Sequence, residues 1–268
     1  MQNQINIPII LDAVRKVGDI FLKDYKQNVI PQNMNDLLKQ LENIDTLCLT
    51  SLKQDLSLEF PNIPWHIGDE FDTDSQRNPT QQECYWLCDA MDGAIQYLQH
   101  IAGWTINLAL IHDEKPVFSV IFDPLANEIF WAEDGQGAFM NGKLLQNSRK
   151  TDLAVMLAVF EYGHQDKSYN DLNNKIGASV TKLLQNFGIV RNYGPHGLQL
   201  AYVGAGRIDL FVQEDLDTYN WIAGLLIAKE AGAEILTTDG NPWKWGSESL
   251  LVAPKSITEK YLQIKVQK

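Results

Sequence analysis

Three aspartates in the sequence have the type and spacing of a divalent-cation site. Asp69 follows a short strand-like segment that ends at Ile67, and Asp89 and Asp92 follow a second such segment, Tyr85–Cys88. Carboxylates at the ends of two adjacent strands can converge on one point. Magnesium prefers hard oxygen ligands, usually one or two carboxylates together with water and phosphate oxygens. The pattern therefore predicts a site for one or two Mg²⁺ ions at these aspartates.

A predicted anion-binding segment follows these aspartates directly in the chain. Gly93, Ala94 and Ile95 are expected to open a short helix, whose free N–H groups and positive dipole end favour an anion. Two metal ions facing these N–H groups would orient a phosphate and acidify a water for in-line attack. The alternative is that Asp89 and Asp92 are only turn and N-cap residues, which are common before helices. Spacing alone leaves both interpretations open.

The elements that must position these residues begin with two helices and a set of strands. Ile10, Val14, Val17 and Phe21 recur at spacings of four, three and four, which predicts a helix that starts near Pro8. A second helix is indicated by the apolar stripe Leu37, Leu41, Ile44, Cys48 and Leu52. Short β-type runs then predict an antiparallel meander. These runs are Cys84–Cys88, Trp104–Ile111, Pro116–Phe122 and Glu128–Ala132.

The second half of the chain alternates strands with helices, which is typical of a layered α/β arrangement. Strands are predicted near Val155–Phe160, Ile208–Val212 and Leu250–Val252, and helices near Tyr169–Phe187, Leu198–Val203 and Tyr219–Ala231. No stretch rich in Pro, Gly or Ser separates the two halves. We therefore expect one domain over 1–268 with two subdomains, approximately 1–147 and 148–268.

The charge of the chain limits its partners. A net charge of −12 at pH 7 disfavours nucleic acid, whose binding depends on Lys and Arg contacts to phosphates. A small phosphate ester can still bind if metal ions reverse the local field. The N-terminus lacks the features of a signal peptide, and no apolar run approaches the ~20 residues of a membrane span. We expect a cytoplasmic protein without a membrane partner.

Several motifs in the same order resemble those of the inositol-monophosphatase-like family of metal-dependent phosphatases, over about Leu37 to Pro254. The family pattern is an acidic pair after a strand, then D-P-I/L-D-G-T-x-N, then W-D-x-A-A-G before a helix that ends in E-A-G-G. The corresponding segments here are Asp69-Glu70, Asp89 to Gln96, Asn220 to Gly224 and Glu230 to Ala233. The resemblance implies an α/β (α+β) fold built as an α-β-α-β-α sandwich, a homodimer, and Mg²⁺-dependent hydrolysis of a small phosphorylated metabolite.

The resemblance also implies roles for individual residues. The metal ligands would be Asp69, Asp89, the main-chain carbonyl of Met91, Asp92 and Asn220. The phosphate would meet the N–H groups of Gly93 and Ala94, next to Ile95. His196 lies where the family has a substrate-facing loop, so it is either a substrate contact or a packing residue at a helix start. Gln213 stands where inositol phosphatases often use Glu to hold a sugar hydroxyl, which leaves inositol specificity open.

Departures from the family pattern fall on functional positions. Leu41 and Ala94 occupy the positions of the Asp and Thr that activate the nucleophilic water, and Glu42, one residue out of register, is the only nearby replacement. General-base assistance typically contributes ~10²–10⁴-fold. Asp69 is shorter by about 1.5 Å, one carbon–carbon bond, than the family's bridging Glu, and Asn220 brings no negative charge. Two hypotheses result: a phosphomonoesterase with impaired turnover that acts on a polyol, sugar or nucleotide phosphate, or a non-catalytic relative that binds a phosphorylated metabolite or a protein.

Overall fold

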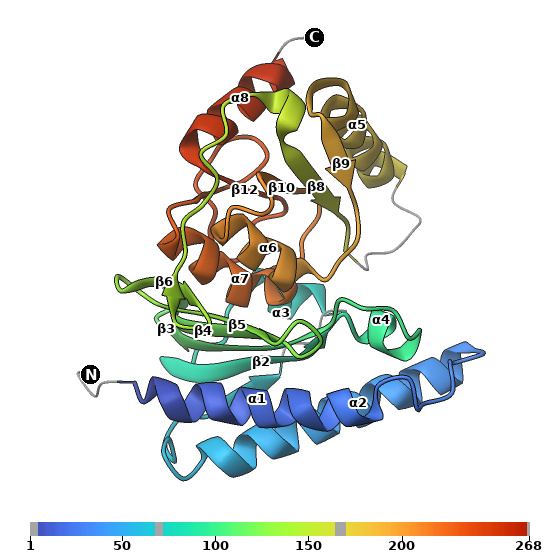
Figure 1. Ribbon diagram of the computed structural model, residues 1–268, viewed down its shortest axis with the longest axis vertical. Coiled ribbons are helices and arrows are strands. Elements are labelled where there is room, and N and C mark those ends of the chain that lie inside the picture. The colour runs from blue at the N-terminus through green and yellow to red at the C-terminus, as the bar shows by residue number, and fades with distance from the viewer. Residues whose placement is uncertain (1–4, 68–71, 164–169, 267–268) are drawn as a thin grey trace.

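The computed structural model, which describes residues 5–67, 72–163 and 170–266, has five layers (Figure 1). Two helices cover one face of a seven-stranded sheet, two more lie between this sheet and a five-stranded sheet, and a final pair covers the outer face of the second sheet. The predicted α-β-α-β-α sandwich is confirmed. From the first layer to the last, the helices are α1 (Ile7–Asp24), α2 (Met34–Leu56), α6 (His196–Gly204), α7 (Thr218–Glu230), α5 (Asn170–Asn186) and α8 (Lys255–Val266).

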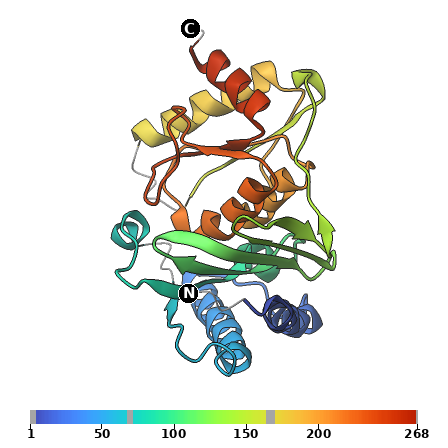
Figure 2. The ribbon, with the colours of Figure 1, turned by 90° about the vertical axis from the view of Figure 1, so that its left-hand side faces the viewer.

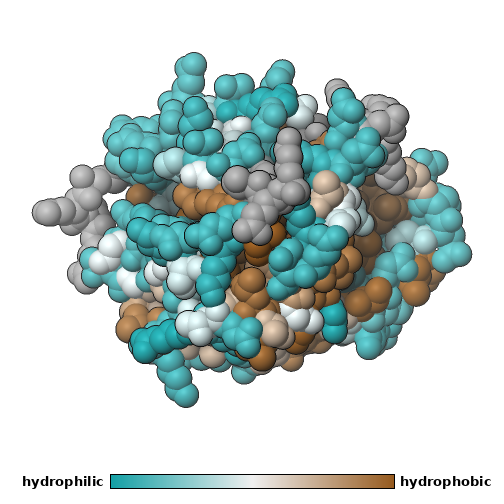
Figure 3. Space-filling model, turned by 90° about the horizontal axis from the view of Figure 1, so that it is seen from above, coloured by the Kyte–Doolittle hydropathy of each residue, from teal (hydrophilic) through white to brown (hydrophobic). Residues whose placement is uncertain are grey.

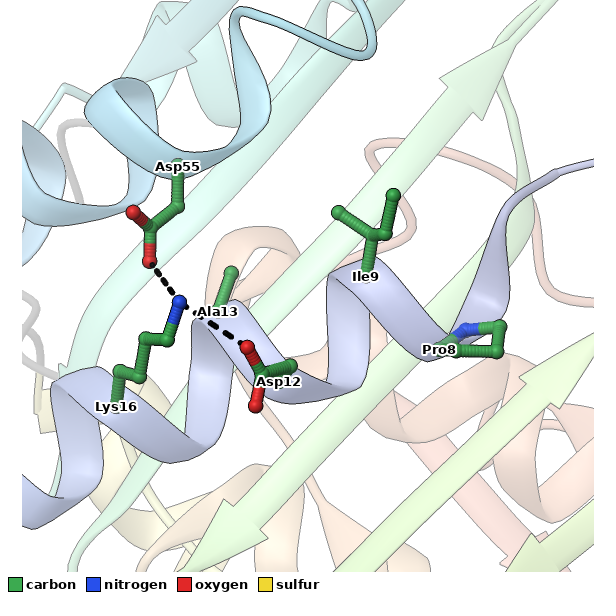
Figure 4. A pocket seen from close by; sticks show the side chains of 6 residues that line it. All are labelled: Pro8, Ile9, Asp12, Ala13, Lys16 and Asp55. Carbon is green, nitrogen blue, oxygen red and sulfur yellow. Dashed lines mark ion pairs between the residues drawn. The ribbon is translucent and has the colours of Figure 1, made fainter.

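The outer layer of α1 and α2 packs through the two predicted apolar stripes. Ile10, Val14, Val17 and Phe21 are buried on α1, which removes apolar surface from water against the seven-stranded sheet. Lys16 joins the two helices at one edge: its Nζ lies 3.0 Å from Asp12 Oδ2 and 3.3 Å from Asp55 Oδ2 (Figure 4). These charged groups line an open hollow of about 340 Å³. Asp55 is near the end of α2, so this hollow lies far along the helix from Leu41.

The seven-stranded sheet runs in chain order from β1 to β7. Its pairs are antiparallel, as the meander predicts, apart from the parallel pair β1·β2. The prediction that the second strand ends at Cys88 was wrong, because β2 continues to Asp92 through an irregularity in its pairing with β3. The strands are β1 (Trp65–Ile67), β2 (Cys84–Asp92), β3 (Thr105–His112), β4 (Lys115–Asp123), β5 (Glu128–Glu133), β6 (Gly137–Met140) and β7 (Lys143–Leu144).

The five-stranded sheet has the order β11-β12-β10-β8-β9. Strand β8 pairs in parallel with β10 and β9, whereas β12 runs antiparallel to β10 and β11. The sequence analysis predicted β8, β10 and β12 but not the two short edge strands or α8. The strands are β8 (Leu157–Glu161), β9 (Ile189–Arg191), β10 (Leu210–Gln213), β11 (Glu234–Leu236) and β12 (Leu250–Ala253).

The middle layer, formed by α6 and α7, lies between the two sheets (Figure 2). Helix α7 is buried from Thr218 to Ala228, on every side, because sheets lie on two of its faces and α6 lies beside it. Such a helix shows no amphipathic stripe. Three short helices complete the described elements: α3 (Thr73–Arg77), α4 (Ala94–Leu98) and the 3₁₀ turn Leu153–Val155.

One end of the molecule shows how hydrophilic and hydrophobic residues are distributed on its surface. Hydrophilic residues cover most of the end of the molecule that carries α5 and α8, with some hydrophobic residues between them (Figure 3). Within the described ranges, none of the helices combines the length and apolar character needed to cross a membrane.

Candidate active site

The irregular end of β2 brings two carboxylates to one amide. Asn107 lies opposite Asp89 in the β2·β3 register, and its Nδ2 donates to Asp92 Oδ2 at 3.1 Å and approaches Asp89 Oδ2 at 3.5 Å. Thr105 Oγ1 donates to Asn107 Oδ1 at 2.9 Å and so fixes which way the amide faces. A bulge re-aims side chains relative to a regular strand. Here it lets residues three apart share one partner, Asn107. The predicted convergence also includes Asp69, which lies outside the described residues, so it stays a prediction.

Asp92 is the most buried of the predicted acidic site residues that the structure describes. It is 3% exposed, and it accepts a second hydrogen bond from the backbone N–H of Gly197 at 2.7 Å. Burial raises the pKa of Asp92 from 3.8 to about 6, because loss of solvent outweighs the hydrogen bonds that favour the anion. A buried carboxylate of this kind is stabilised by a nearby cation.

The predicted anion-binding turn lies against the loop before α6. Gly93 has a φ of +85° and precedes α4, and no described side chain caps the start of this helix. A β-carbon at Gly93 would lie 2.6 Å from the carbonyl oxygen of Gly103 and 3.3 Å from Pro195 Cβ, so only glycine fits. Ala94 is partly buried and packs against the core beneath β2, whereas Ile95 is exposed.

His196, the first residue of α6, lies among carboxylates between the two sheets. Its Nε2 is 3.3 Å from Asp217 Oδ2 and 4.0 Å from Glu161 Oε2, and the three residues are buried. Burial lowers the pKa of His196, but the charge of four surrounding carboxylates outweighs burial, and the pKa is raised above its ordinary value. In order of their effect, these carboxylates are Asp217, Asp92, Glu161 and Asp215.

Asp217 is held by both of its oxygens. Gln213 Nε2 donates to its Oδ2 at 3.0 Å, and Asn220 Nδ2 donates to its Oδ1 at 2.7 Å. The other end of Gln213 accepts from Trp221 Nε1 at 2.8 Å. Gln213 is therefore bonded within the protein at both ends of its amide, and its assignment as a substrate contact stays a prediction. The amide oxygen is the atom of Asn220 that could coordinate a cation.

Glu161 organises the loop that leads into α6. Its Oε1 accepts from the backbone N–H of Gly194 at 2.9 Å and from Gln199 Nε2 at 2.5 Å, while its Oε2 accepts from Asn192 Nδ2 at 2.8 Å. These bonds join the end of β8 to both sides of the turn before His196. The backbone of this loop is thereby fixed against the turn at Gly93.

The residues at the predicted water-activating positions differ in their surroundings. Leu41 packs against the core beneath β2, on the same stripe as Ile44. Glu42, the tentative catalytic residue, is exposed, and its side chain makes no hydrogen bond to another described residue. Helix α2 contacts α4, so Leu41 and Ala94 belong to neighbouring elements. The side chains of Leu41 and Ala94 are hydrocarbons, so neither can hydrogen-bond to a water between α2 and α4.

The structure describes four of the five predicted magnesium ligands. Asp69 lies outside the described residues, and within 5–67, 72–163 and 170–266 no three His, Cys, Asp or Glu side chains are arranged to hold a metal ion. The predicted ligands that are described are Asp89, Asp92, the Met91 carbonyl and Asn220. Their oxygens are hard donors of the kind that Mg²⁺ prefers. The donor set therefore fits Mg²⁺ in type, with Asp69 needed as a further carboxylate.

Sequence reasoning missed three polar residues of this region: Asn107, Glu161 and Asp217. Asn107 had a detectable signal, because an amide in the middle of an otherwise apolar strand must find a buried partner. Asp217 directly precedes a helix, where aspartate is common for local reasons. Glu161 had no signal, since its partners lie more than thirty residues away in the chain.

The sequence and the fold of the chain are similar to those of known proteins. A model of the inositol monophosphatase family matches residues 5–268. Nus factor SuhB of Escherichia coli K12 is 27% identical over 233 residues, which span 87% of this chain and 84% of that protein. Inositol monophosphatase 3 of Solanum lycopersicum is 26% identical over 239 residues, 88% of this chain and 87% of that protein. The crystal structure of extragenic suppressor protein suhB from Bartonella henselae superposes with a TM-score of 0.79 at 22% identity, covering 97% of this chain and 98% of that one.

Proposed function

The chain belongs to the inositol monophosphatase family, and we propose that it is a magnesium-dependent phosphomonoesterase of low turnover. Its substrate would be a small phosphorylated polyol, sugar or nucleotide. The observation that carries this function is the junction of Asp89 and Asp92, joined through Asn107, with the glycine turn at Gly93. Family members are typically metal-dependent, and the oxygen donors of this site suit Mg²⁺.

The family resemblance suggests a role for each of these residues. Asp69, Asp89, Asp92, the Met91 carbonyl and Asn220 would hold the metal. Bound ions would neutralise the phosphate and acidify a water. The N–H groups of Gly93 and Ala94 would donate to phosphate oxygens, and donors aimed at developing charge lower the barrier.

Low turnover is expected because the water-activating pair is missing. Leu41 is a packing residue and Ala94 has no hydroxyl, so neither can accept a proton. General-base assistance is worth ~10²–10⁴-fold, while the N–H donors and carboxylates of the site would remain. Slow, metal-dependent hydrolysis is the expected behaviour.

Restoring the pair tests this function. We expect Leu41→Asp with Ala94→Thr to raise kcat on a generic phosphate monoester by about 10–10³-fold at saturating Mg²⁺, less than a full general-base effect because supporting contacts are absent. Each single change should do far less, since the two groups act as a unit. Circular dichroism should first establish that all variants fold. A parent enzyme already near a typical kcat of about 10 s⁻¹ would contradict the assignment of Leu41.

The second candidate is a non-catalytic family member that binds a phosphorylated metabolite or a protein partner. Two observations favour it: the apolar residues at the water-activating positions, and the name Nus factor carried by the Escherichia coli relative. Inorganic phosphate binding without turnover, in the parent and in the double variant, would select this candidate. The family resemblance also leads us to propose a homodimer, which light scattering on the eluting protein would test.

A further inference from the structure

The extra residue in β2 brings four polar side chains to one face of the sheet. Strands β2 and β3 are neighbours in the seven-stranded sheet (Figure 1), and their register pairs Asp89 with Asn107 but Asp92 with Thr105. Regular pairing would place Met91 opposite Thr105. Side chains two apart on a strand lie on the same face, so the irregularity gives Asp92 the place that Met91 would otherwise take. The two aspartates therefore share a face with Thr105 and Asn107.

The amide of Asn107 lies between the two carboxylates. Its Nδ2 donates to Asp92 Oδ2 at 3.1 Å and lies 3.5 Å from Asp89 Oδ2. An ionised carboxylate only accepts hydrogen bonds, so the NH₂ end of the amide is the end that faces both aspartates. The other end, Oδ1, accepts from Thr105 Oγ1 at 2.9 Å. Asn107 and Thr105 are both buried, so bulk water does not compete for these contacts.

These contacts hold the two carboxylates and keep their charge. The contacts of Asn107 end on the Oδ2 atom of each aspartate, and the N–H of Gly197 also ends on Asp92 Oδ2. None of these contacts uses the Oδ1 atom of Asp89 or Asp92. The amide is neutral, so it donates to two anionic groups without cancelling the charge that attracts a cation. A Lys or Arg at the same place would cancel one of the two charges.

We infer that Asn107 is a positioning residue of the magnesium site: it holds Asp89 and Asp92 together for a shared Mg²⁺ ion, and Thr105 holds Asn107. The inference rests on the proposed function. Without the amide, two like charges repel each other and must be brought together as the ion binds, which lowers the affinity. Residues that orient the ligands of a metal typically change its affinity by about 10–100-fold.

Two substitutions test the two links of this chain of contacts. Asn107→Leu keeps the approximate size of the side chain but has no N–H, and it should weaken Mg²⁺ binding by about 10–100-fold in a calorimetric titration. Thr105→Val removes only the hydroxyl that holds the amide, and it should weaken binding by about tenfold, the lower end of that range. Thr105→Ser keeps the hydroxyl and should bind Mg²⁺ as the parent does.

The matched control is Thr258→Val, the same chemical change at another buried threonine. Thr258 is on α8, and its Oγ1 donates to Glu234 Oε2 of β11, in the outer part of the second sheet. This variant should be less stable than the parent but should bind Mg²⁺ with the parent affinity. Circular dichroism establishes that each titrated variant is folded. The same loss of affinity in Thr258→Val as in Thr105→Val would overturn the inference.

A measurement on the unaltered protein does not depend on the folding of variants. In a nitrogen–proton correlation NMR spectrum, the side-chain NH₂ signals of Asn107 should shift as Mg²⁺ is added, with the Kd that calorimetry gives, because their acceptors become ligands. Unshifted signals at saturating Mg²⁺, or parent affinity in both Asn107→Leu and Thr105→Val, would overturn the role of Asn107 alone. A parent that binds no Mg²⁺ by either method would overturn the proposed metal-dependent function, and this role with it.

Discussion

The carboxylate of Asp92 should lower the stability of the protein as pH rises. Burial raises its pKa to about 6, above the 3.8 expected when the chain is unfolded. The folded state therefore holds the proton more tightly, and stability is lost between about pH 4 and pH 6 as the buried group ionises. Asp92→Asn should be more stable than the parent by about 1–3 kcal/mol at pH 8 in EDTA, with little difference at pH 4. Urea denaturation at the two pH values measures this.

Magnesium provides the control for this prediction. An ion that binds only the folded parent stabilises it by mass action, so the gap between parent and Asp92→Asn should narrow when Mg²⁺ replaces EDTA. A gap that is the same at pH 4 and pH 8 would mean that ionisation of Asp92 is not its source.

The substitution Asn220→Asp should have opposite effects on Mg²⁺ affinity and on the stability of the metal-free protein. A carboxylate in its place adds a charged oxygen for the metal, and Asn220→Asp should bind Mg²⁺ about tenfold more tightly, a difference of about 1.4 kcal/mol. Without metal the same change sets two carboxylates against each other, because the present amide donates to Asp217. The metal-free variant should therefore unfold at lower urea concentration than the parent. Calorimetric titration tests the first part, and equal affinity would show that Asn220 is not a ligand.

At the scale of the elements, the periodicity of apolar residues predicted the helices and strands that are determined by burial of one face. The stripe of α1 and the alternating runs of the meander depend on burial of one face, and both are found as expected. The edge strands β9 and β11 are three residues each and form only because a neighbouring strand pairs with them. The bulge at the end of β2 likewise depends on β3. Such features have no local signal, which is why the sequence analysis missed them.

The candidate site was likewise predictable only where its residues are close in the chain. The motif that begins at Asp89 contains Asp89, Asp92 and the glycine turn, so the sequence alone was enough to find them. The cluster of His196, Asp217 and Glu161 joins three elements that meet only in the folded layers. Tertiary packing of that kind leaves no spacing to find in a single sequence.

The crossing of α6 and α7 should tolerate no added carbon. A β-carbon at Gly224 would lie 2.5 Å from Leu200 Cβ and 3.0 Å from the carbonyl oxygen of Gly197. Gly224→Ala should destabilise the protein by about 1–3 kcal/mol through overpacking. The control is Gly177→Ala on the exposed face of α5, where nothing lies within 4 Å; it should stabilise by about 0.5–1 kcal/mol. Denaturant titration compares them, and equal effects would refute the close crossing.

At the scale of the whole molecule, the two halves build one hydrophobic cluster together, while two further clusters lie each within one half. The same hydrophobic cluster contains Ile121 and Phe130 from the first half and Leu200 and Trp221 from the second. Arg207, just after α6, makes a bidentate ion pair with Glu128 of β5, with both N–O distances at 2.6 Å. The inner face of the seven-stranded sheet is thus covered by helices that belong to the later part of the chain (Figure 2).

This sharing predicts that 1–147 and 148–268 do not fold independently. Tryptophan fluorescence and far-UV circular dichroism should report one coincident urea transition for the whole chain, the usual test of cooperative unfolding. The fragment 1–147 expressed alone should lack a cooperative transition, because its sheet would expose the face that α6 and α7 cover. Arg207→Lys, which replaces a bidentate pair by a single point charge, should shift both probes of the intact chain equally. Two separated transitions, or a fragment that unfolds cooperatively, would show that each half has a sufficient core of its own, and that the site between them forms by docking of preformed parts.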